Sequence, residues 1–593
     1  MINFLSSFRV VFVATVWLLF SCIHVKTLDA QPENAPVLPL AELRNGMAGE
    51  VWTVFRGTEA EPFTVKVTGV IQNALGPGKS MILCELIDPK VQHMGAVAGM
   101  SGSPLYIEGK FAGALSYQVQ RFETVRFAGF TPAEDLLEVR RIAANAKQDG
   151  NSHTLPANVL SSPISSHSSA GLTPLNPVFN FGGLAPHVAE LLVEPLAELG
   201  IATISLGGSI DSSASPQADE TFELIAGQAV GAALAIGDIT LAGTGTVSQV
   251  DGARVLAFGH RLLGLGEVEM PMTAAEIVTI LPSNLSSVKI SNTGRVIGTV
   301  RQDRLSAIYG ELGDGPPMIP VTVTTPQRSL DFSTVRHPNI TPMITAMGLS
   351  QAVLGSNDSG LTEGFSLETR VEFPECEELV MSQLYAGSKS FRDGLAGLTR
   401  DLTTWLQNPV EKAFPDRVNF VVTALSENPT TSLDNVQISH RTARSSETVL
   451  VTLSMRNFQS HSFSQTVEIP VTSDWIGKTL EVIVANGPTL DLVAGGQRTF
   501  PVSQIRDFSA YLNMLRSQRL PDGIYVAIAS STELFLDQTE STMELPGSFA
   551  RIATSTDRAR FSQRKAREIL WETHLLADRL VPGTIRRPLV ITD

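Results

Sequence analysis

The stretch GAVAGMSGSPLYIEGKFAGALSYQ, residues 95–118, places one small hydroxyl side chain, Ser101, between two glycines. Glycine on both sides of a serine lets the backbone turn so that several N–H groups point at one spot. The N–H groups of Gly99 and Ser101 could then bind a developing oxyanion while a neighbouring base activates the hydroxyl. The same hexapeptide, GMSGSP, could instead form only a tight hairpin turn. The rest of the chain has to decide between these interpretations.

Composition indicates a folded, strand-rich protein of several domains. The chain has 593 residues, more than one hydrophobic core usually organises, with 43% hydrophobic and 17% charged residues, 47 Gly and 34 Pro. Its formal net charge is −15, and no long run of Lys or Arg occurs. We therefore expect no nucleic-acid partner, because nothing supplies a phosphate-neutralising surface.

The first segment, residues 1–30, has the pattern of a secretory signal peptide. Its apolar run, residues 10–25, is shorter than the roughly 20 residues that a membrane-spanning helix needs. A retained membrane anchor is the weaker alternative. Lipid attachment at Cys22 is another, disfavoured by the bulky Phe20. We expect export to the periplasm or the medium.

Metal, disulfide and nucleotide chemistry find little support in the sequence. Beyond Cys22 only Cys84 and Cys376 remain, too few for a disulfide framework. The ten histidines are scattered and form no HExxH pattern. The stretch NALGPGKS ends like a phosphate-binding loop but has Asn73 where that loop needs glycine. We expect neither a metal nor an organic cofactor.

Strand and turn patterns divide the chain. Alternating apolar residues over 38–140 predict a sheet that curls, such as a small barrel, and residues rich in Ser and Pro follow. The spacing predicts helices over 186–200, 341–355 and 390–407, and the basic segment 557–580 is also expected to be helical. Strands return within 222–325, and those of 413–490 have the spacing of a β-sandwich.

Two blocks resemble the SpoIVB-type peptidases, serine peptidases of chymotrypsin-like descent named for the stage IV sporulation protein B. FTVKVTGVIQNALGPGKSMILCELIDPKVQHMGAVAGMSGSPLYIEGKFAGALSY, residues 63–117, resembles the half that bears the serine. AGTGTVSQVDGARVLAFGH together with RVIGTVRQDRLSAIYGELGDGPPMIPVTV, within 242–323, is similar to the half that bears the histidine. In the sporulation peptidase the histidine half comes first, so the two halves are permuted here.

The resemblance implies a mainly β protein, a permuted chymotrypsin-like double β-barrel with added helices and a C-terminal β-sandwich-like domain. The expected segments are a signal peptide, 1–30; a serine-bearing barrel half, 38–140; a Ser/Pro-rich linker, 141–180; a histidine-bearing barrel half, 181–350; a mixed helix/strand connector, 351–412; a sandwich-like domain, 413–490; and a C-terminal α/β segment, 491–593.

Carried over residue by residue, the resemblance makes Ser101 the nucleophile, His260 of AFGH the general base and acid, and Asp88 of LIDP the group that orients the imidazole. The oxyanion hole would be the N–H groups of Gly99 and Ser101. Taken alone, a histidine at a strand end or an Asp-Pro pair is more often structural. Their occurrence with the serine turn favours the triad.

We therefore predict an exported serine endopeptidase that makes restricted cuts in protein or peptide substrates. A catalytically inactive, peptidase-like binding or scaffold protein of the cell envelope, with envelope proteins as partners, is the alternative. Self-cleavage in the segment 149–177 is a third possibility.

Overall fold

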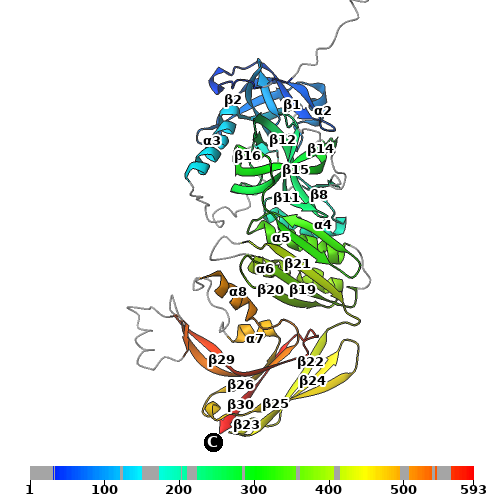
Figure 1. Ribbon diagram of the computed structural model, residues 1–593, viewed down its shortest axis with the longest axis vertical. Helices are drawn as coiled ribbons and strands as arrows, with labels where there is room; N and C mark the ends of the chain where they lie inside the picture. Colours follow the sequence, from blue (N-terminus) through cyan, green and yellow to red (C-terminus); the bar gives the residue numbers. More distant parts are fainter. Residues whose placement is uncertain are drawn as a thin grey trace, which may run out of the picture.

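The chain folds into sheets stacked along one long axis. This computed structural model describes residues 31–32, 34–119, 125–149, 172–175, 177–201, 204–206, 208–209, 223–283, 287–355, 361–406, 414–494, 507–536, 541–543 and 562–592. Its strands form sheets of seven, fourteen, three and six members within these residues. From blue to red, the chain in Figure 1 runs from one end of the molecule to the other. The prediction of a mainly β protein is confirmed.

The first sheet contains the serine stretch, and its hydrogen-bonded pairing closes on itself. The pairing runs β4-β1-β2-β3-β6-β5, and β5 pairs again with β4. Its buried side chains, such as Val65, Ile82 and Phe130, form one core. The strands are β1 (Ala48–Val54), β2 (Ala60–Gly76), β3 (Lys79–Leu86), β4 (Pro104–Ile107), β5 (Lys110–Val119), β6 (Phe127–Pro132) and the appended β7 (Leu172–Pro174).

The second sheet contains a similar closed set of six strands. Its pairing runs β11-β14-β15-β16-β13-β12, and β12 pairs again with β11. These strands are β11 (Ala229–Gly237), β12 (Thr240–Asp251), β13 (Arg254–Ala257), β14 (Gly266–Leu281), β15 (Val288–Arg304) and β16 (Ala307–Leu312). Three short strands adjoin them: β8 (Val178–Gly182), β9 (Ile204–Leu206) and β10 (Gly208–Ser209).

The same sheet continues from β11 toward the middle of the molecule. Its further strands, in pairing order, are β18 (Ser329–Thr334), β17 (Ile319–Thr324), β21 (Arg417–Ala424), β19 (Phe365–Glu372) and β20 (Leu379–Tyr385). The helices α4 (Pro186–Glu198), α5 (Ile340–Leu354) and α6 (Gly387–Leu406) share one large core with these strands. These helices confirm the three helices predicted over 186–200, 341–355 and 390–407.

Two further helices and the predicted linker belong to the first half of the chain. Helix α2 (Pro89–Met94) leads into the serine stretch. Helix α3 (Ala133–Asp149) extends into the segment predicted as a linker, while 150–171 and the predicted signal peptide, 1–30, lie outside the described residues. No helix of the described part is long and apolar enough to cross a membrane.

The C-terminal part packs two sheets against each other. Their facing side chains, such as Val451, Ile469, Val482 and Val526, form one core. One sheet contains β22 (Thr431–Ile438), β24 (Thr448–Asn457) and β25 (Ser462–Pro470). The other contains β23 (Thr442–Arg444), β30 (Thr584–Thr592), β26 (Leu480–Ala485), β27 (Ile524–Leu536), β28 (Ser541–Met543) and β29 (Ser562–Leu575). The second sheet thus draws strands from beyond residue 490.

The prediction of a helix within 557–580 is wrong, because residues 562–575 form strand β29. This strand pairs along its length with β27, from Ile524 opposite Leu575 to Leu536 opposite Ser562. Charged residues occur in both states, so their presence alone did not exclude a strand. The partner strand, distant in sequence, decides the conformation here.

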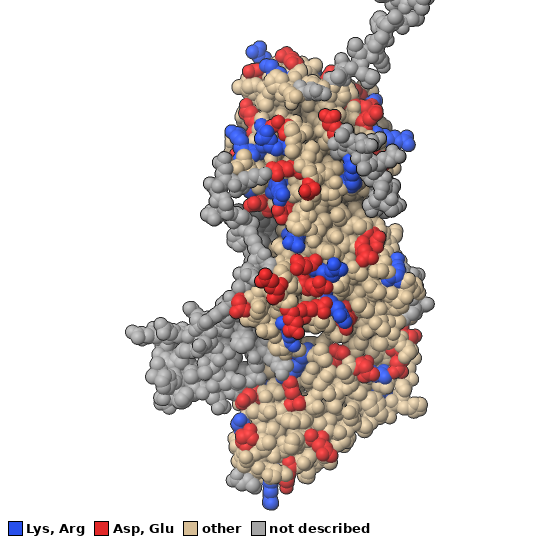
Figure 2. Space-filling view, in the orientation of Figure 1, with Lys and Arg blue, Asp and Glu red and all other residues tan. Residues whose placement is uncertain are grey.

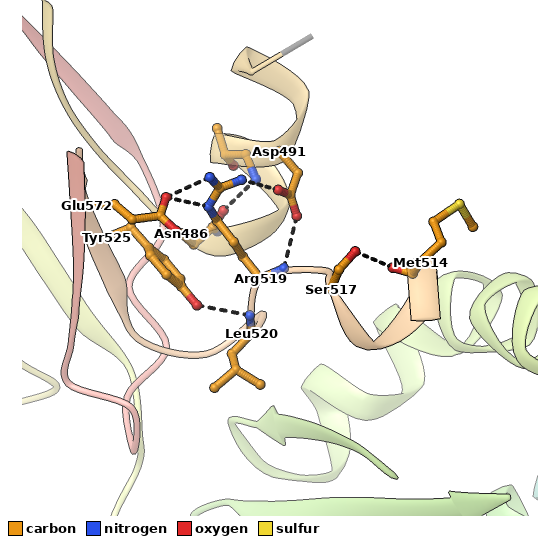
Figure 3. A network of polar contacts seen from close by, with 9 residues as sticks. Asn486, Asp491, Met514, Ser517, Arg519, Leu520, Tyr525 and Glu572 are labelled. Atoms are coloured by element: carbon orange, nitrogen blue, oxygen red, sulfur yellow. Dashed lines mark hydrogen bonds and ion pairs between the residues drawn. The ribbon is translucent and has the colours of Figure 1, made fainter. Parts of the chain in front are cut away.

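Arg519 holds the C-terminal part together through a buried ion-pair network, drawn in Figure 3. Its side chain is 3% exposed. Its Nε and Nη2 donate to one carboxylate oxygen of Glu572 on β29, at 2.8 and 2.6 Å, and its Nη1 pairs with Asp491. Asp491 lies on α7 (Gly487–Val493) and also accepts the N–H of Arg519 at 3.2 Å. One guanidinium therefore ties α7 to the sheet.

Helix α8 (Phe508–Arg516) connects this part to the middle of the molecule. Its side chains Phe508, Leu512 and Leu515 belong to the core around α5 and α6. The hydroxyl of Tyr511 donates to the carbonyl of Thr404 on α6 at 2.5 Å.

On the face drawn in Figure 2, acidic and basic side chains lie interspersed along the whole molecule.

We expect Arg519→Met to destabilise the C-terminal part, because it removes the cation and leaves two partly buried carboxylates facing each other. Breaking a buried pair in this way costs about 3 kcal/mol. Scanning calorimetry of the full chain should show a lower midpoint for one transition. Arg441→Met, at an exposed arginine, is the control and should leave the scan unchanged. Equal midpoints for both variants would contradict the proposed role of the network.

Candidate active site

The serine stretch forms a tight turn between α2 and β4, and two glycines make it possible. Gly99 and Gly102 have φ of +96° and +97°, in the left-handed region that favours glycine. A Cβ atom on Gly102 would lie 2.0 Å from the carbonyl oxygen of Thr246 and 2.5 Å from the backbone nitrogen of Phe258. The turn is therefore pressed against β12 and against the segment that leads to His260.

Strand β12 holds the carbonyl groups of this turn. The N–H of Thr246 donates to the carbonyl of Ser101 at 2.8 Å, and its hydroxyl donates to the carbonyl of Gly99 at 3.2 Å. The hydroxyl of Ser248 donates to the carbonyl of Gly102 at 2.8 Å. Contacts with a strand from the other half of the chain thus fix three of the four carbonyl groups from Gly99 to Gly102.

The N–H groups on the turn divide into bonded and unbonded ones. Met100 and Gly102 donate to the carbonyls of Val97 and Leu115, at 2.9 and 2.7 Å. Within the described residues, the N–H groups of Gly99 and Ser101 have no hydrogen-bond acceptor. These are the two donors that the sequence assigned to an oxyanion hole. Their availability is the arrangement that stabilisation of an oxyanion requires.

His260 follows a strained bend at the end of β13. Phe258 and Gly259 have φ of +70° and +64°, and a left-handed conformation is unusual for a buried phenylalanine. The hydroxyl of Thr131 on β6 donates to the carbonyl of Gly259 at 2.7 Å. The first sheet therefore holds the backbone immediately before His260.

The turn with Ser101 and the bend before His260 meet at Thr246. While its N–H bonds to Ser101, its carbonyl accepts the N–H of Phe258 at 3.1 Å. Ser101 is fully buried and His260 is 2% exposed. The fold thus brings two of the three predicted catalytic residues into one region, although they are far apart in the sequence.

The reactive atoms of both residues lack partners. The Ser101 Oγ and the His260 Nε2 are buried, and neither has a hydrogen-bond partner in the described part of the chain, so they are not bonded to each other. Buried polar groups are normally hydrogen-bonded, so two orphans in one region call for an explanation. A functional role is one, since catalytic hydrogen bonds often tighten only when substrate binds.

The His260 ring is held in the neutral form suited to a base. Its Nδ1 lies 2.6 Å from the carbonyl oxygen of Arg261, so this nitrogen carries the proton and Nε2 keeps a free lone pair. Burial lowers the pKa of His260 to about 4, while the backbones of Arg261 and Leu175 act in the opposite direction. The imidazole is therefore uncharged and able to accept a proton at neutral pH.

Asp88 caps a helix in this structure. It is half-buried at the N-terminus of α2, where its Oδ1 accepts the N–H of Lys90 at 2.9 Å. Among the described residues no hydrogen bond or ion pair joins Asp88 to His260, and the Nδ1 of His260 bonds instead to the carbonyl of Arg261. Asp88 thus has the helix-capping contact that is typical of an Asp-Pro pair.

Asp303, which sequence reasoning missed, shapes the loop after His260. This aspartate on β15 is 1% exposed and accepts the backbone N–H groups of Leu262, Leu263, Gly264 and Leu265, at 2.7, 2.8, 2.7 and 3.1 Å. Burial raises the pKa of Asp303, and the four donors partly offset this. Its carboxylate fixes the backbone directly after Arg261, whose carbonyl orients the imidazole.

No local signal in the sequence marks Asp303, because the N–H groups that donate to its carboxylate come from a loop about forty residues earlier in the chain. Lys289, another missed residue, is buried beside Gly99. As to metals, the described residues contain no group of three or more His, Cys, Asp or Glu side chains placed to bind one.

Asparagine substitutions can distinguish the roles of Asp88 and Asp303. The measurement is the rate at which a fluorophosphonate labels Ser101. Asparagine caps helices as well as aspartate does, so Asp88→Asn should label within about threefold of wild type. Asp303→Asn places an NH₂ group against backbone N–H donors, and a misplaced loop should slow labelling by about a hundredfold. Circular dichroism checks that both variants are folded. A hundredfold loss in Asp88→Asn would instead restore Asp88 as the third catalytic residue.

Comparison with known families bears on the serine-bearing half. A family model described as SpoIVB peptidase S55 matches residues 20–123, a segment that includes Asp88, Gly99 and Ser101 but not His260. No curated protein and no solved structure matches the chain. The family indicates a peptidase, a hydrolase of peptide bonds. The matched segment is thus similar to SpoIVB-type peptidases, and the predicted resemblance is confirmed there.

Proposed function

We propose that the protein is an exported serine endopeptidase of the SpoIVB type, with Ser101 as nucleophile and His260 as general base. One observation carries the proposal. Two segments far apart in sequence meet at Thr246 and leave the Ser101 Oγ and the His260 Nε2 buried and without a hydrogen-bond partner among the residues that the structure describes. Unpaired polar atoms are costly to bury, and such groups cluster at functional sites.

The strand pairing supports a permuted chymotrypsin-like double barrel as the scaffold. Each of the first two sheets contains six strands whose pairing returns to its start, as closure of a barrel requires. Ser101 precedes a strand of the first ring, and His260 follows a strand of the second. Because a triad is defined by geometry, the reversed order of the halves is compatible with the same chemistry.

The proposed reaction uses acyl transfer through the serine. The Ser101 Oγ attacks the carbonyl carbon of the substrate peptide bond, and its proton passes to the His260 Nε2. The N–H groups of Gly99 and Ser101 stabilise the negative charge that develops on the carbonyl oxygen. His260 then protonates the leaving amine, and water hydrolyses the acyl-enzyme by the reverse use of the same groups.

Burial of the site supports restricted cutting. Neither Ser101 nor His260 presents its reactive atom to solvent, so a substrate must open the site before it can react. A peptide or small probe that does not favour this opening would react only slowly, during spontaneous openings of the site. The expected substrates are therefore particular exported proteins or peptides, and the expected signal peptide, 1–30, supports work in the periplasm or outside the cell.

Two observations favour the alternative, a catalytically inactive binding or scaffold protein of the cell envelope. The Nδ1 of His260 bonds to a backbone carbonyl where a triad has a carboxylate, and the serine–histidine hydrogen bond is not formed. In that case the C-terminal pair of sheets would contact the partner proteins.

A fluorophosphonate probe distinguishes the two. We expect the wild-type protein to be labelled at Ser101, located by peptide mass mapping. Ser101→Ala should abolish this label, and His260→Ala should slow it by about a thousandfold, because the hydroxyl then lacks its base.

Ser439 and His440 provide a matched control. Their side chains are hydrogen-bonded at 2.7 Å and exposed, but they lie outside the serine turn. Ser439→Ala and His440→Ala should leave labelling unchanged. A folded wild-type protein that takes up no label, even at high probe concentration, would favour the binding protein.

A further inference from the structure

Lys289 is a fully buried lysine that packs against the serine turn. It lies on β15, and its backbone N–H donates to the carbonyl of Ala98 at 3.0 Å. Its side-chain stem covers Gly99, because a Cβ atom on that glycine would lie 3.0 Å from the Lys289 Cβ and 3.2 Å from its Cδ. The lysine therefore contacts the two residues that precede Met100 and Ser101.

The amine of Lys289 has little to compensate a charge. Its Nζ donates to the hydroxyl of Thr53 on β1, at 3.0 Å, and Thr53 is itself fully buried. An ammonium group carries three N–H donors, and the described residues offer this one neutral acceptor and no ion pair. A buried charge without a partner is strongly disfavoured, so the site suits the uncharged amine.

Burial accordingly lowers the pKa of Lys289 to about 7, and it is the sole cause that acts. Among the described residues, the neighbouring elements place no negative charge close enough to stabilise the protonated amine. The serine turn, residues 95–103, has no charged residue, while Glu50 of β1 and Glu276 of β14 are half-buried and do not act on the amine. The amine can thus change its charge in the neutral range.

We propose that Lys289 is a positioning residue for the reaction at Ser101, which holds Gly99 in place while its amine is uncharged and releases it when the amine is protonated. The uncharged amine needs no hydrogen-bond partner beyond the Thr53 hydroxyl, so the aliphatic part of the side chain stays against Gly99. The N–H of Gly99 is one of the two proposed oxyanion donors. Protonation favours movement of the amine toward water, which withdraws the stem. This inference rests on the proposed function.

The effect of Lys289 can be separated from that of His260 by pH. His260, with a pKa of about 4, remains an uncharged base at pH 5.5, so its protonation does not explain a loss near neutrality. A fall in reactivity with a midpoint near pH 7 therefore reports on Lys289. The variant Lys289→Met keeps an unbranched stem but cannot be charged, and Lys289→Ala removes the stem.

The experiment measures the fluorophosphonate labelling rate of Ser101 from about pH 4 to 9 in the full-length protein and both variants. Wild type should react at least about tenfold more slowly at pH 5.5 than at pH 8.5, as expected for one ionisation with a pKa near 7. Lys289→Met should keep its rate down to the ionisation of His260 near pH 4. Lys289→Ala should label slowly at every pH, because it lacks the side-chain stem. The faster labelling of Lys289→Met would then show that an uncharged stem is sufficient.

Thermal unfolding provides an independent check. An unfolded lysine stays protonated up to a pKa of about 10.4, whereas the folded one loses its proton near 7, so wild-type stability should rise with pH between these values. The melting temperature of wild type should therefore increase relative to that of Lys289→Met from pH 7 to 10. This comparison still tests the amine if Lys289→Ala fails to fold.

Two results would overturn the proposal while Ser101 remains reactive. One is a wild-type profile that falls only near pH 4, and the other is a Lys289→Met profile that keeps a midpoint near 7. Labelling that is absent from folded wild type at every pH would overturn the proposed function, and this inference with it.

Discussion

The site depends on the backbone of Thr246, which bonds to Ser101 through its N–H and to Phe258 through its carbonyl. This pair of hydrogen bonds joins the turn of one sheet to the bend of the other. A side chain at Gly102 would separate them, since its Cβ would collide with both Thr246 and Phe258. The serine turn and the bend before His260 are thus joined by hydrogen bonds between backbone atoms. These bonds do not depend on which half of the site comes first along the chain.

Around this contact the protein buries several polar and titratable groups. Ser101, His260, Asp303 and Lys289 are each at most 2% exposed, and three of them have shifted pKa values caused mainly by desolvation. Such burial lowers stability, and it persists only where the surrounding structure holds each group firmly. Here the large core beneath the second sheet and the hydrogen bonds from β12 provide that support. The same burial keeps the serine from solvent, which is why opening of the site matters to the proposed activity.

Local patterns predicted what local residues determine. The glycines around Ser101 predicted a turn with free N–H groups, and the local patterns of apolar residues predicted α4, α5 and α6. What depends on distant partners escaped prediction. Strand β29 is a strand because β27 pairs with it, and the four N–H donors of Asp303 come from a different loop. Asp88 shows the converse, since a structural role was readable from the Asp-Pro pair, whereas the bond of the His260 ring to Arg261 in place of Asp88 depended on the fold.

The central claim is that Ser101, His260 and the N–H groups of Gly99 and Ser101 act together on the carbonyl group of one substrate peptide bond. A crystal structure of the protein after reaction with a fluorophosphonate tests this most directly, because the bound phosphonyl oxygen mimics the oxyanion. The account predicts phosphorus bonded to the Ser101 Oγ, the phosphonyl oxygen within about 3 Å of both N–H groups, and the His260 Nε2 within hydrogen-bonding distance of the adduct. An adduct whose oxygen points away from these donors, with His260 still unpartnered, would contradict it.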